Sequence, residues 1–417
     1  MRDIWVAVAA VLIVVGIAIQ APAPVAIGAL ILLTGGVSRF WSRVALEHVE
    51  YERHPESRRA FVGETVEISY TLINRKLLPV PWIEVRDCVP EHAAPEGVHT
   101  APAPMPEMLY LSRSTSLASY ERVTWRHRLR CTTRGFYQLG PVHFRSGDVF
   151  GLYPTTGEDE RLDRLTVLPR LLDLRQIGLP DLRPFGETRG GSRIFEDQSR
   201  IVGVRDYRPG DPLKRIDWKA TARRQQLQAR VYDPSATLNL LVALNVSTLE
   251  HPWEGYDPLL LERAISVAGS VASFADEKRY AAGLAANCTF PNADRHIWIA
   301  PGRDPDQLTR ILESLAMVSP FVLGPLEEVL QNTSRRLPLG ATVVVVAGFL
   351  SDGLRAYLTR GGAGTQNLSM IWVGDRAAPP LPDRVEVYDA GPYLRDFERQ
   401  WQIEHAGRQA AGAWAGG

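Results

Sequence analysis

The chain opens with two apolar segments that a water-soluble fold could bury only with difficulty. Residues 4–19 carry no charged side chain, and a second apolar run covers residues 25–37 after the sequence Gln-Ala-Pro-Ala-Pro. Each run is somewhat shorter than the roughly 20 residues that cross a bilayer, so flanking residues must contribute. Neither run has the polar stripe of a surface helix. We predict a membrane hairpin over residues 1–43, with a signal peptide cleaved near residues 21–23 and a buried pair of core helices as alternatives.

Charges next to these segments predict how the hairpin is oriented. Arg2 precedes the first run, Arg39 and Arg43 follow the second, and the turn between the runs carries no charge. The positive-inside rule then places both chain ends in the cytoplasm. The expected localisation is the inner (cell) membrane, two-pass, with the soluble domains cytoplasmic. Three scattered cysteines form neither a disulfide framework nor a metal motif, which suits a reducing compartment.

The rest of the chain changes its periodicity near residue 237. Residues 44–170 contain repeated period-two stretches and a proline-rich connection over 90–106, which predicts a β-sandwich with one long loop. Residues 171–236 form a connector, and residues 237–400 alternate apolar strands with helices. This alternation predicts a mainly parallel, doubly wound sheet. The predicted fold class is α+β multidomain, with a disordered tail over 401–417.

The connector contains a basic block with an unusual series of residues. From Arg183 to Tyr232 there are twelve Lys and Arg residues against six Asp and Glu, although the formal net charge of the chain is zero. The block contains, in order, Arg205, Tyr207, Pro209, Gly210, Asp211, Arg215, Ile216, Trp218, Ala222 and Arg223. This series closely resembles the signature of the bacterial domain-of-unknown-function family 58. Residues 134–152 resemble the segment that precedes the signature in the same family. No reaction is known for this family, so the resemblance does not indicate an enzymatic activity.

The signature block has two interpretations. As a binding surface, its bases would grip an acidic partner or a phosphate. As a structural element, its acids would pair with those bases, and Trp218 would be buried between two domains. We favour the structural interpretation because the acidic residues interleave with the basic ones. The candidate binding residues are Arg205, Tyr207, Pro209, Gly210, Asp211, Arg215, Asp217, Trp218, Lys219 and Arg223.

The second half of the chain resembles a von Willebrand factor type A domain. The resemblance implies a Mg²⁺ site with the pattern D-x-S-x-S after the first strand and a second Asp further on. Here Asn245 takes the place of the first Asp, Ser247 is kept, Leu249 replaces the second Ser, and Asp352 is the candidate distal acid. Mg²⁺ prefers oxygen ligands that include one or two carboxylates. We therefore expect no Mg²⁺ binding and no cofactor.

The sequence contains no motif that identifies an enzyme: no phosphate-binding loop, no H-E-x-x-H and no G-x-S-x-G. We predict a membrane-anchored binding or scaffold protein rather than an enzyme. The resemblance to family 58 implies a MoxR-type AAA+ ATPase as partner, in chaperone-like assembly of envelope or metal-enzyme clients. One alternative is a hydrolase that uses Asp211, Asp217 and Arg215 in an interdomain cleft. The other is a phosphate or nucleic-acid binder that uses the basic block.

Overall fold

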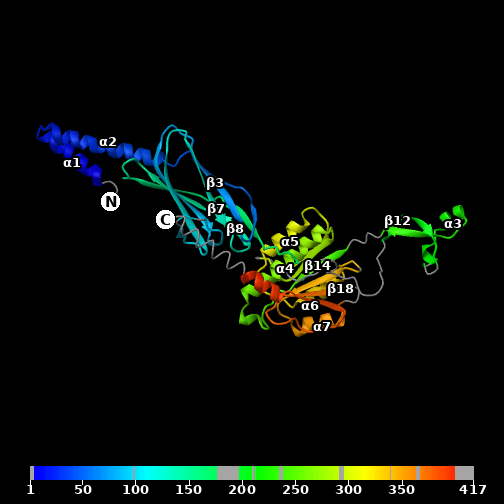
Figure 1. The fold of residues 1–417 in the computed structure, drawn as a ribbon. Coiled ribbons are helices and arrows are strands. Elements are labelled where there is room, and N and C mark those ends of the chain that lie inside the picture. The colour runs from blue at the N-terminus through cyan, green and yellow to red at the C-terminus, as the bar shows by residue number, and fades with distance from the viewer. Residues whose placement is uncertain are drawn as a thin grey trace. The chain divides into compact units, whose positions relative to one another are not determined.

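The chain divides into two compact units, residues 1–168 and 169–417 (Figure 1). The computed structural model describes residues 4–95, 97–98, 100–175, 197–208, 211, 213–233, 238–290, 295–338, 340–362 and 367–399. The tail predicted to be disordered, 401–417, lies outside the described residues, as do Pro209 and Gly210 of the signature block.

The first unit begins with two apolar helices that pack against each other, α1 (Ile4–Ala18) and α2 (Pro22–Val44). Glycines allow their backbones to approach closely: a Cβ added at Gly28 would lie 2.7 Å from the Ala9 carbonyl oxygen. Helix α2 is long and apolar enough to cross a bilayer, with a mean hydropathy of 1.6 and few buried residues, whereas α1 is shorter. The two helices are therefore candidates for membrane anchoring.

Three sheets make up the rest of the first unit. The strands are β1 (Val49–Pro55), β2 (Arg59–Phe61), β3 (Thr65–Asn74), β4 (Val80–Pro90), β5 (Thr100–Pro102), β6 (Met108–Leu117), β7 (Arg122–Arg130), β8 (Gly135–Leu139), β9 (Val142–Gly147), β10 (Pro154–Asp159) and β11 (Asp163–Leu168). The sheet orders are β1-β3-β7, β10-β9-β4-β6-β5 and β2-β11-β8. All strand pairs are antiparallel except β2 with β11. One apolar cluster with residues from all three sheets forms the core.

The second unit starts with a small two-stranded arm. Its strands are β12 (Asp197–Asp206) and β13 (Gln228–Asp233), which pair antiparallel. Between them lie a 3-10 turn (Leu213–Arg215) and helix α3 (Trp218–Arg224). The described residues of the signature block lie in these elements, which we call the signature arm.

A six-stranded sheet forms the body of the second unit. Its strands are β14 (Asn239–Leu244), β15 (Ala281–Thr289), β16 (His296–Gly302), β17 (Thr342–Ala347), β18 (Asn367–Trp372) and β19 (Val385–Asp389), in the order β16-β15-β14-β17-β18-β19. Only β16 runs antiparallel to its neighbour. The central strands β14 and β17 are almost wholly buried, as expected for parallel strands that are covered on both faces.

Helices cover both faces of this sheet (Figure 1). Helices α4 (Pro258–Glu277) and α5 (Gln307–Ala316) pack against each other and against one face. Helices α6 (Leu326–Ser334) and α7 (Asp352–Arg360) contribute to the apolar cluster on the other face. Helix α4 is also long and apolar enough to span a membrane, but most of it is buried, which is typical of a core helix.

All three cysteines of the chain are buried thiols. Cys88 lies on β4 and Cys131 follows β7 in the first unit, whereas Cys288 lies on β15 in the second. Burial raises the pKa of the Cys88 and Cys131 thiols to about 11. The two thiols of the first unit are therefore protonated at neutral pH.

Candidate binding site at the carboxyl edge of the sheet

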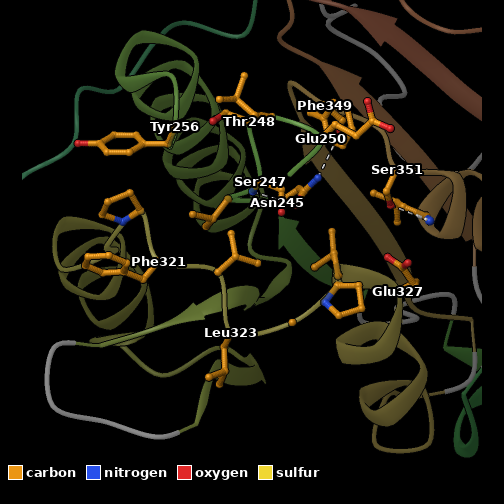
Figure 2. Close-up of a pocket in the computed structure, with 18 of the residues that line it drawn as sticks. Asn245, Ser247, Thr248, Glu250, Tyr256, Phe321, Leu323, Glu327, Phe349 and Ser351 are labelled. Atoms are coloured by element: carbon orange, nitrogen blue, oxygen red, sulfur yellow. Dashed lines mark hydrogen bonds between the residues drawn. The ribbon is translucent and has the colours of Figure 1, made fainter. Parts of the chain in front are cut away.

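A cavity of about 480 Å³ opens where the central strands of the six-stranded sheet end (Figure 2). Its lining comes from the segment after β14 (245–250), the loop before α6 (320–325), the first residues of α6 and the segment between β17 and α7. In open α/β sheets, ligands bind outside the carboxyl ends of the strands. The cavity is thus at the position that the topology favours for a binding site.

Two buried amides, Asn245 in the cavity lining and Asn287 next to it, are hydrogen bonded to each other. Asn245 follows β14, and its Nδ2 donates a hydrogen bond of 2.9 Å to the carbonyl of Phe349, which lies beyond β17. Asn287 is fully buried on β15. Its Nδ2 donates to Asn245 Oδ1 (3.1 Å) and to Ser247 Oγ (3.2 Å), and its Oδ1 accepts from the Val246 amide (2.7 Å). These bonds tie together the ends of three neighbouring strands.

Hydroxyl groups in the cavity wall hold backbone amides. Thr248 Oγ1 accepts a hydrogen bond of 2.9 Å from the amide of Asp257, the residue that caps the start of α4. Ser351 caps α7 by accepting a hydrogen bond from the Leu354 amide at 3.1 Å. Both hydroxyls therefore fix the loops around the cavity, as side chains at helix starts commonly do.

The predicted metal residues do not come together in a way that fits Mg²⁺. Asn245 Oδ1 already accepts from Asn287 and from the Ser247 amide, and Ser247 Oγ accepts from Asn287. Asp352 is exposed at the start of α7 and is not part of the cavity lining. Among the described residues, no group of three or more His, Cys, Asp or Glu side chains could hold a metal ion. The members of the set that line the cavity, Asn245 and Ser247, therefore offer no carboxylate, the ligand that Mg²⁺ prefers.

Two residues, Glu327 in the cavity lining and Asn287 next to it, were not singled out from the sequence. Asn287 is the one buried amide in an otherwise apolar strand segment, so a polar residue within a buried strand was the available signal. Glu327 lies in the first turn of α6, a helix that the sequence analysis also missed. Its carboxylate lines the cavity and contacts Gly353 in the first turn of α7. No feature of the sequence links Glu327 to Asn245 in advance.

The signature arm holds its own acidic residues. Asp211 accepts two hydrogen bonds from the Arg205 guanidinium, both 2.8 Å long, and one from the Arg208 amide at 2.9 Å. The Tyr207 hydroxyl donates to the backbone carbonyl of Asp211 at 3.0 Å. The hydrogen bonds from Arg205 are the main reason that the pKa of Asp211 lies below its usual range. The predicted pairing of Asp211 with a signature arginine is confirmed.

Asp217 caps the N-terminus of helix α3. Its Oδ1 accepts from the amides of Lys219 and Ala220, each at 3.0 Å, and its Oδ2 accepts from Arg230 at 3.1 Å. The Ala220 amide contributes most to holding the pKa of Asp217 below its usual range. Arg215 lies in the 3-10 turn, and Arg223 is exposed on the last turn of α3.

Within the signature arm itself, Trp218 is not buried. The Trp218 side chain is 68 % exposed, and the neighbouring Lys219 is exposed as well. Trp218 is the first residue of α3, directly after its cap, and no residue of this short helix is buried. The apolar contact inside the arm is made instead by Ile216, which is 5 % exposed.

These features define a mixed α/β protein with several sheets, candidate membrane-anchoring helices and a cavity at a sheet edge. Residues 203–404 match the model of the family described as protein of unknown function DUF58, which confirms the resemblance and assigns this part of the chain to that family. The uncharacterized protein YeaD of Bacillus subtilis (strain 168) is 26 % identical over 241 residues. That match covers 58 % of this chain and 56 % of YeaD, so this chain matches little more than half of its relative.

Two similar solved structures each match 29 % of the chain. A CARDB domain from Pyrococcus furiosus is 15 % identical, with a TM-score of 0.21, and the alignment covers 29 % of this chain and 87 % of that domain. The sporulation control protein Spo0M from Bacillus subtilis is 13 % identical, with a TM-score of 0.19, over 29 % of this chain and 49 % of Spo0M. These scores are too low to support an inference about fold or function.

Proposed function

We propose that the chain is a membrane-anchored binding protein that recognises a protein partner at the cavity of its second unit. In this proposal the helices α1 and α2 form the membrane hairpin, the three sheets of the first unit form a β-sandwich, and the six-stranded sheet belongs to a von Willebrand factor type A-like domain. Such domains are usually partner-recognition modules. The soluble parts lie on the cytoplasmic side of the inner membrane.

The observation that carries the proposal is the exposed apolar rim of the cavity. Phe321 is 78 % exposed, and Leu323 and Tyr256 are each nearly half exposed. All three line the cavity. Large apolar side chains held in water around a concave site are typical of surfaces that are covered by a partner, and aromatic residues often supply most of the binding energy there.

The chemistry of the lining favours binding over catalysis. Thr248 and Ser351 use their hydroxyls to accept from backbone amides, and Ser247 accepts from Asn287. The described lining contains no histidine, cysteine or lysine that could activate a nucleophile. The residues of the cavity thus supply shape and polar contacts.

The family resemblance suggests which partner to test first. It implies a MoxR-type AAA+ ATPase, with which the chain would act in chaperone-like assembly of envelope or metal-enzyme clients. A partner that works at the membrane surface would meet the second unit in the cytoplasm. The proposal names the class of ATPase and leaves the client open.

The test measures binding of the full chain, held in lipid nanodiscs, to the purified MoxR-type ATPase of the same organism. We expect Phe321→Ala to weaken binding at least about tenfold, the effect of losing one aromatic hot spot. Tyr393→Ala is the matched control, because Tyr393 is an exposed aromatic residue of the same unit outside the cavity. Equal binding by the wild type and Phe321→Ala would place the interface elsewhere.

The signature arm supports a second candidate, binding of a phosphate or nucleic acid. Lys214, Lys219 and Arg223 are exposed on the arm, where they could contact phosphates. Retention of the full chain on heparin that falls steeply with salt, and that is lost when these three residues are replaced by Gln, would support this candidate. Retention that is unchanged by the replacements would contradict it.

The arm gives little support to the hydrolase alternative. A catalytic carboxylate must be available to substrate or water, but Asp211 and Asp217 each accept hydrogen bonds from an arginine and from backbone amides. Their lowered pKa values also disfavour a role as general acid near neutral pH. A structural role for both residues accounts for the same contacts.

A further inference from the structure

The cavity has a one-sided charge distribution. Its described lining contains two carboxylates, Glu250 and Glu327, and no lysine, arginine or histidine. In a concave site with apolar walls, such charges act over short distances with little screening by solvent. The cavity should therefore favour a cationic group and disfavour an anionic one.

Glu327 contributes an acceptor that the described residues leave unsatisfied. Its Oε2 is buried and has no hydrogen-bond partner among the described residues. A buried acceptor without a partner costs free energy, and most such atoms in folded proteins find a donor. Glu327 belongs to the cavity lining, so a donor that enters the cavity and displaces the packing around this oxygen can supply the missing bond.

The carboxylate is held in place by its packing against α7. A Cβ added at Gly353 would overlap Glu327 Oε1, so the carboxylate lies directly against the first turn of that helix. Gly353 is not in a left-handed conformation, so contact with Glu327 is the feature that a larger residue would disturb.

Aromatic rings lie across the cavity from this carboxylate. Figure 2 shows Tyr256 and Phe321 on one side of the pocket and Glu327 with Ser351 on the other, with Asn245 and Ser247 between them. A basic side chain has matching parts: an apolar stem that packs on rings and a charged head that donates hydrogen bonds to a carboxylate. Arginine suits this arrangement best, because its planar guanidinium also stacks on aromatic faces.

We propose that the cavity receives a basic side chain, preferably arginine, from the partner protein. This inference rests on the proposed function and specifies what the partner presents at the site. The volume of about 480 Å³ exceeds that of one side chain, which leaves room for the backbone on either side of the arginine. The amide of Asn245 is already hydrogen bonded to Asn287, so Glu327 supplies the charge-assisted bond and the rings supply the apolar contact.

The test uses short peptides and ligand-observed NMR with the full chain in nanodiscs. The probes are acetyl-Gly-Arg-Gly-amide, the lysine peptide and the citrulline peptide, which has the shape of arginine without its charge. We expect the arginine peptide to bind at least about tenfold more tightly than the citrulline peptide, in line with the loss of a charged hydrogen bond. The lysine peptide should fall between the two.

Three variants assign the effect to one carboxylate. Glu327→Gln keeps the shape of the side chain and should abolish the preference for arginine over citrulline. Gly353→Ala keeps the charge but displaces the carboxylate, so it should weaken the preference. Glu328→Gln is the matched control, because Glu328 is exposed on the same helical turn outside the cavity and should leave the preference unchanged.

Two results would overturn the inference: equal binding of the arginine and citrulline peptides, or an arginine preference that survives in Glu327→Gln. Tighter binding of an aspartate peptide in the presence of Mg²⁺ would also overturn it, in favour of a metal site. Failure here is distinguishable from failure of the proposed function. If Phe321→Ala still releases the ATPase while the peptides show no arginine preference, only the present inference is wrong.

Discussion

Asp87 is a carboxylate in the core of the first unit, where its charge is expensive to maintain. The side chain is 1 % exposed, accepts a hydrogen bond of 2.9 Å from the Tyr51 hydroxyl and lies 3.5 Å from Nε of Arg53. Burial raises the pKa of Asp87 to about 6, with a smaller upward contribution from Asp163, although Arg53 acts in the opposite direction. The arginine thus compensates only part of the desolvation cost.

The raised pKa gives a pH dependence with a definite sign. Between about pH 4 and pH 6 the unfolded chain has lost the Asp87 proton while the folded chain still binds it, so this residue makes folding less favourable as pH rises. The slope is at most about 1.4 kcal/mol per pH unit. The thermal unfolding midpoint of the wild type should therefore fall relative to that of Asp87→Asn across this window. A difference between the two proteins that does not change with pH would contradict the assignment.

Trp218 should contribute little to the stability of the signature arm. Because its side chain is mostly exposed, we expect Trp218→Ala to change stability by less than about 0.5 kcal/mol. Ile216→Ala is the control: Ile216 is buried in the same arm, and its truncation should cost about 2–5 kcal/mol. Hydrogen exchange of the β12 and β13 amides compares the two variants. Faster exchange in Trp218→Ala than in Ile216→Ala would support the interpretation that Trp218 is buried between two domains.

At the scale of single elements, the glycines of the N-terminal helices make a direct prediction. A side chain at Gly28 would collide with the backbone of α1, whereas a Cβ at Gly36 would meet open space. Gly28→Leu should separate the helices and lower the temperature at which the detergent-solubilised chain aggregates. Gly36→Leu adds the same apolar bulk and should leave that temperature unchanged. Equal effects of the two substitutions would mean that the helices do not pack through Gly28.

The hydrogen bonds of Asn245 and Ser247 after strand β14 predict how the protein responds to Mg²⁺. Asn245 and Ser247 already hold protein donors, and Asp352 lies outside the cavity. Mg²⁺ at millimolar concentration should leave the melting temperature of the full chain unchanged. A ligand at a hundredfold excess over its Kd would stabilise the folded state by about 2.7 kcal/mol. A rise in melting temperature that disappears in Asp352→Ala would show that the metal site is functional.

The spacing of apolar residues predicted the long, buried strands and helices well, and the short elements poorly. The continuous apolar runs at 238–246 and 341–348 predict buried strands and form β14 and β17, and the helical spacing of apolar residues over 259–278 predicts α4. Helices α3 and α6 were missed because α3 has no buried face and α6 is short. The proline-rich segment 90–106, predicted as a loop, contains the short strand β5.

The candidate site depended on contacts that no local pattern contains. Asn245 was singled out from its position after an apolar strand, but its partners Asn287 and Phe349 lie 42 and 104 residues further along the chain. The contact of Glu327 with Gly353 joins the starts of two helices on one face of the sheet. Such pairings follow from strand order, which periodicity alone does not determine. The internal pairs of the signature arm were easier to anticipate because they are close in sequence.

At the scale of the whole molecule, the N-terminal hairpin predicts on which side of the membrane the rest of the chain lies. Arg2, Arg39 and Arg43 flank the apolar helices, and the turn between them is uncharged. Both chain ends should therefore be cytoplasmic. A reporter enzyme that is active only in the periplasm should give no signal when fused after Gly417, whereas the same reporter inserted in the turn near residues 20–21 should be active. The reverse pattern would invert the topology and remove the cytoplasmic ATPase as partner.

The three cysteines are distributed so that the opening of each unit can be followed by the reaction of its own thiols. Cys88 and Cys131 are buried in the first unit and Cys288 is buried in the second, and the chain has no other thiol. A thiol-specific alkylating reagent should therefore modify the folded protein only when one of the units opens. Mass spectrometry of the modified peptides would show which unit opened and how often. The native chain thus reports the opening of each unit separately, without any engineered label.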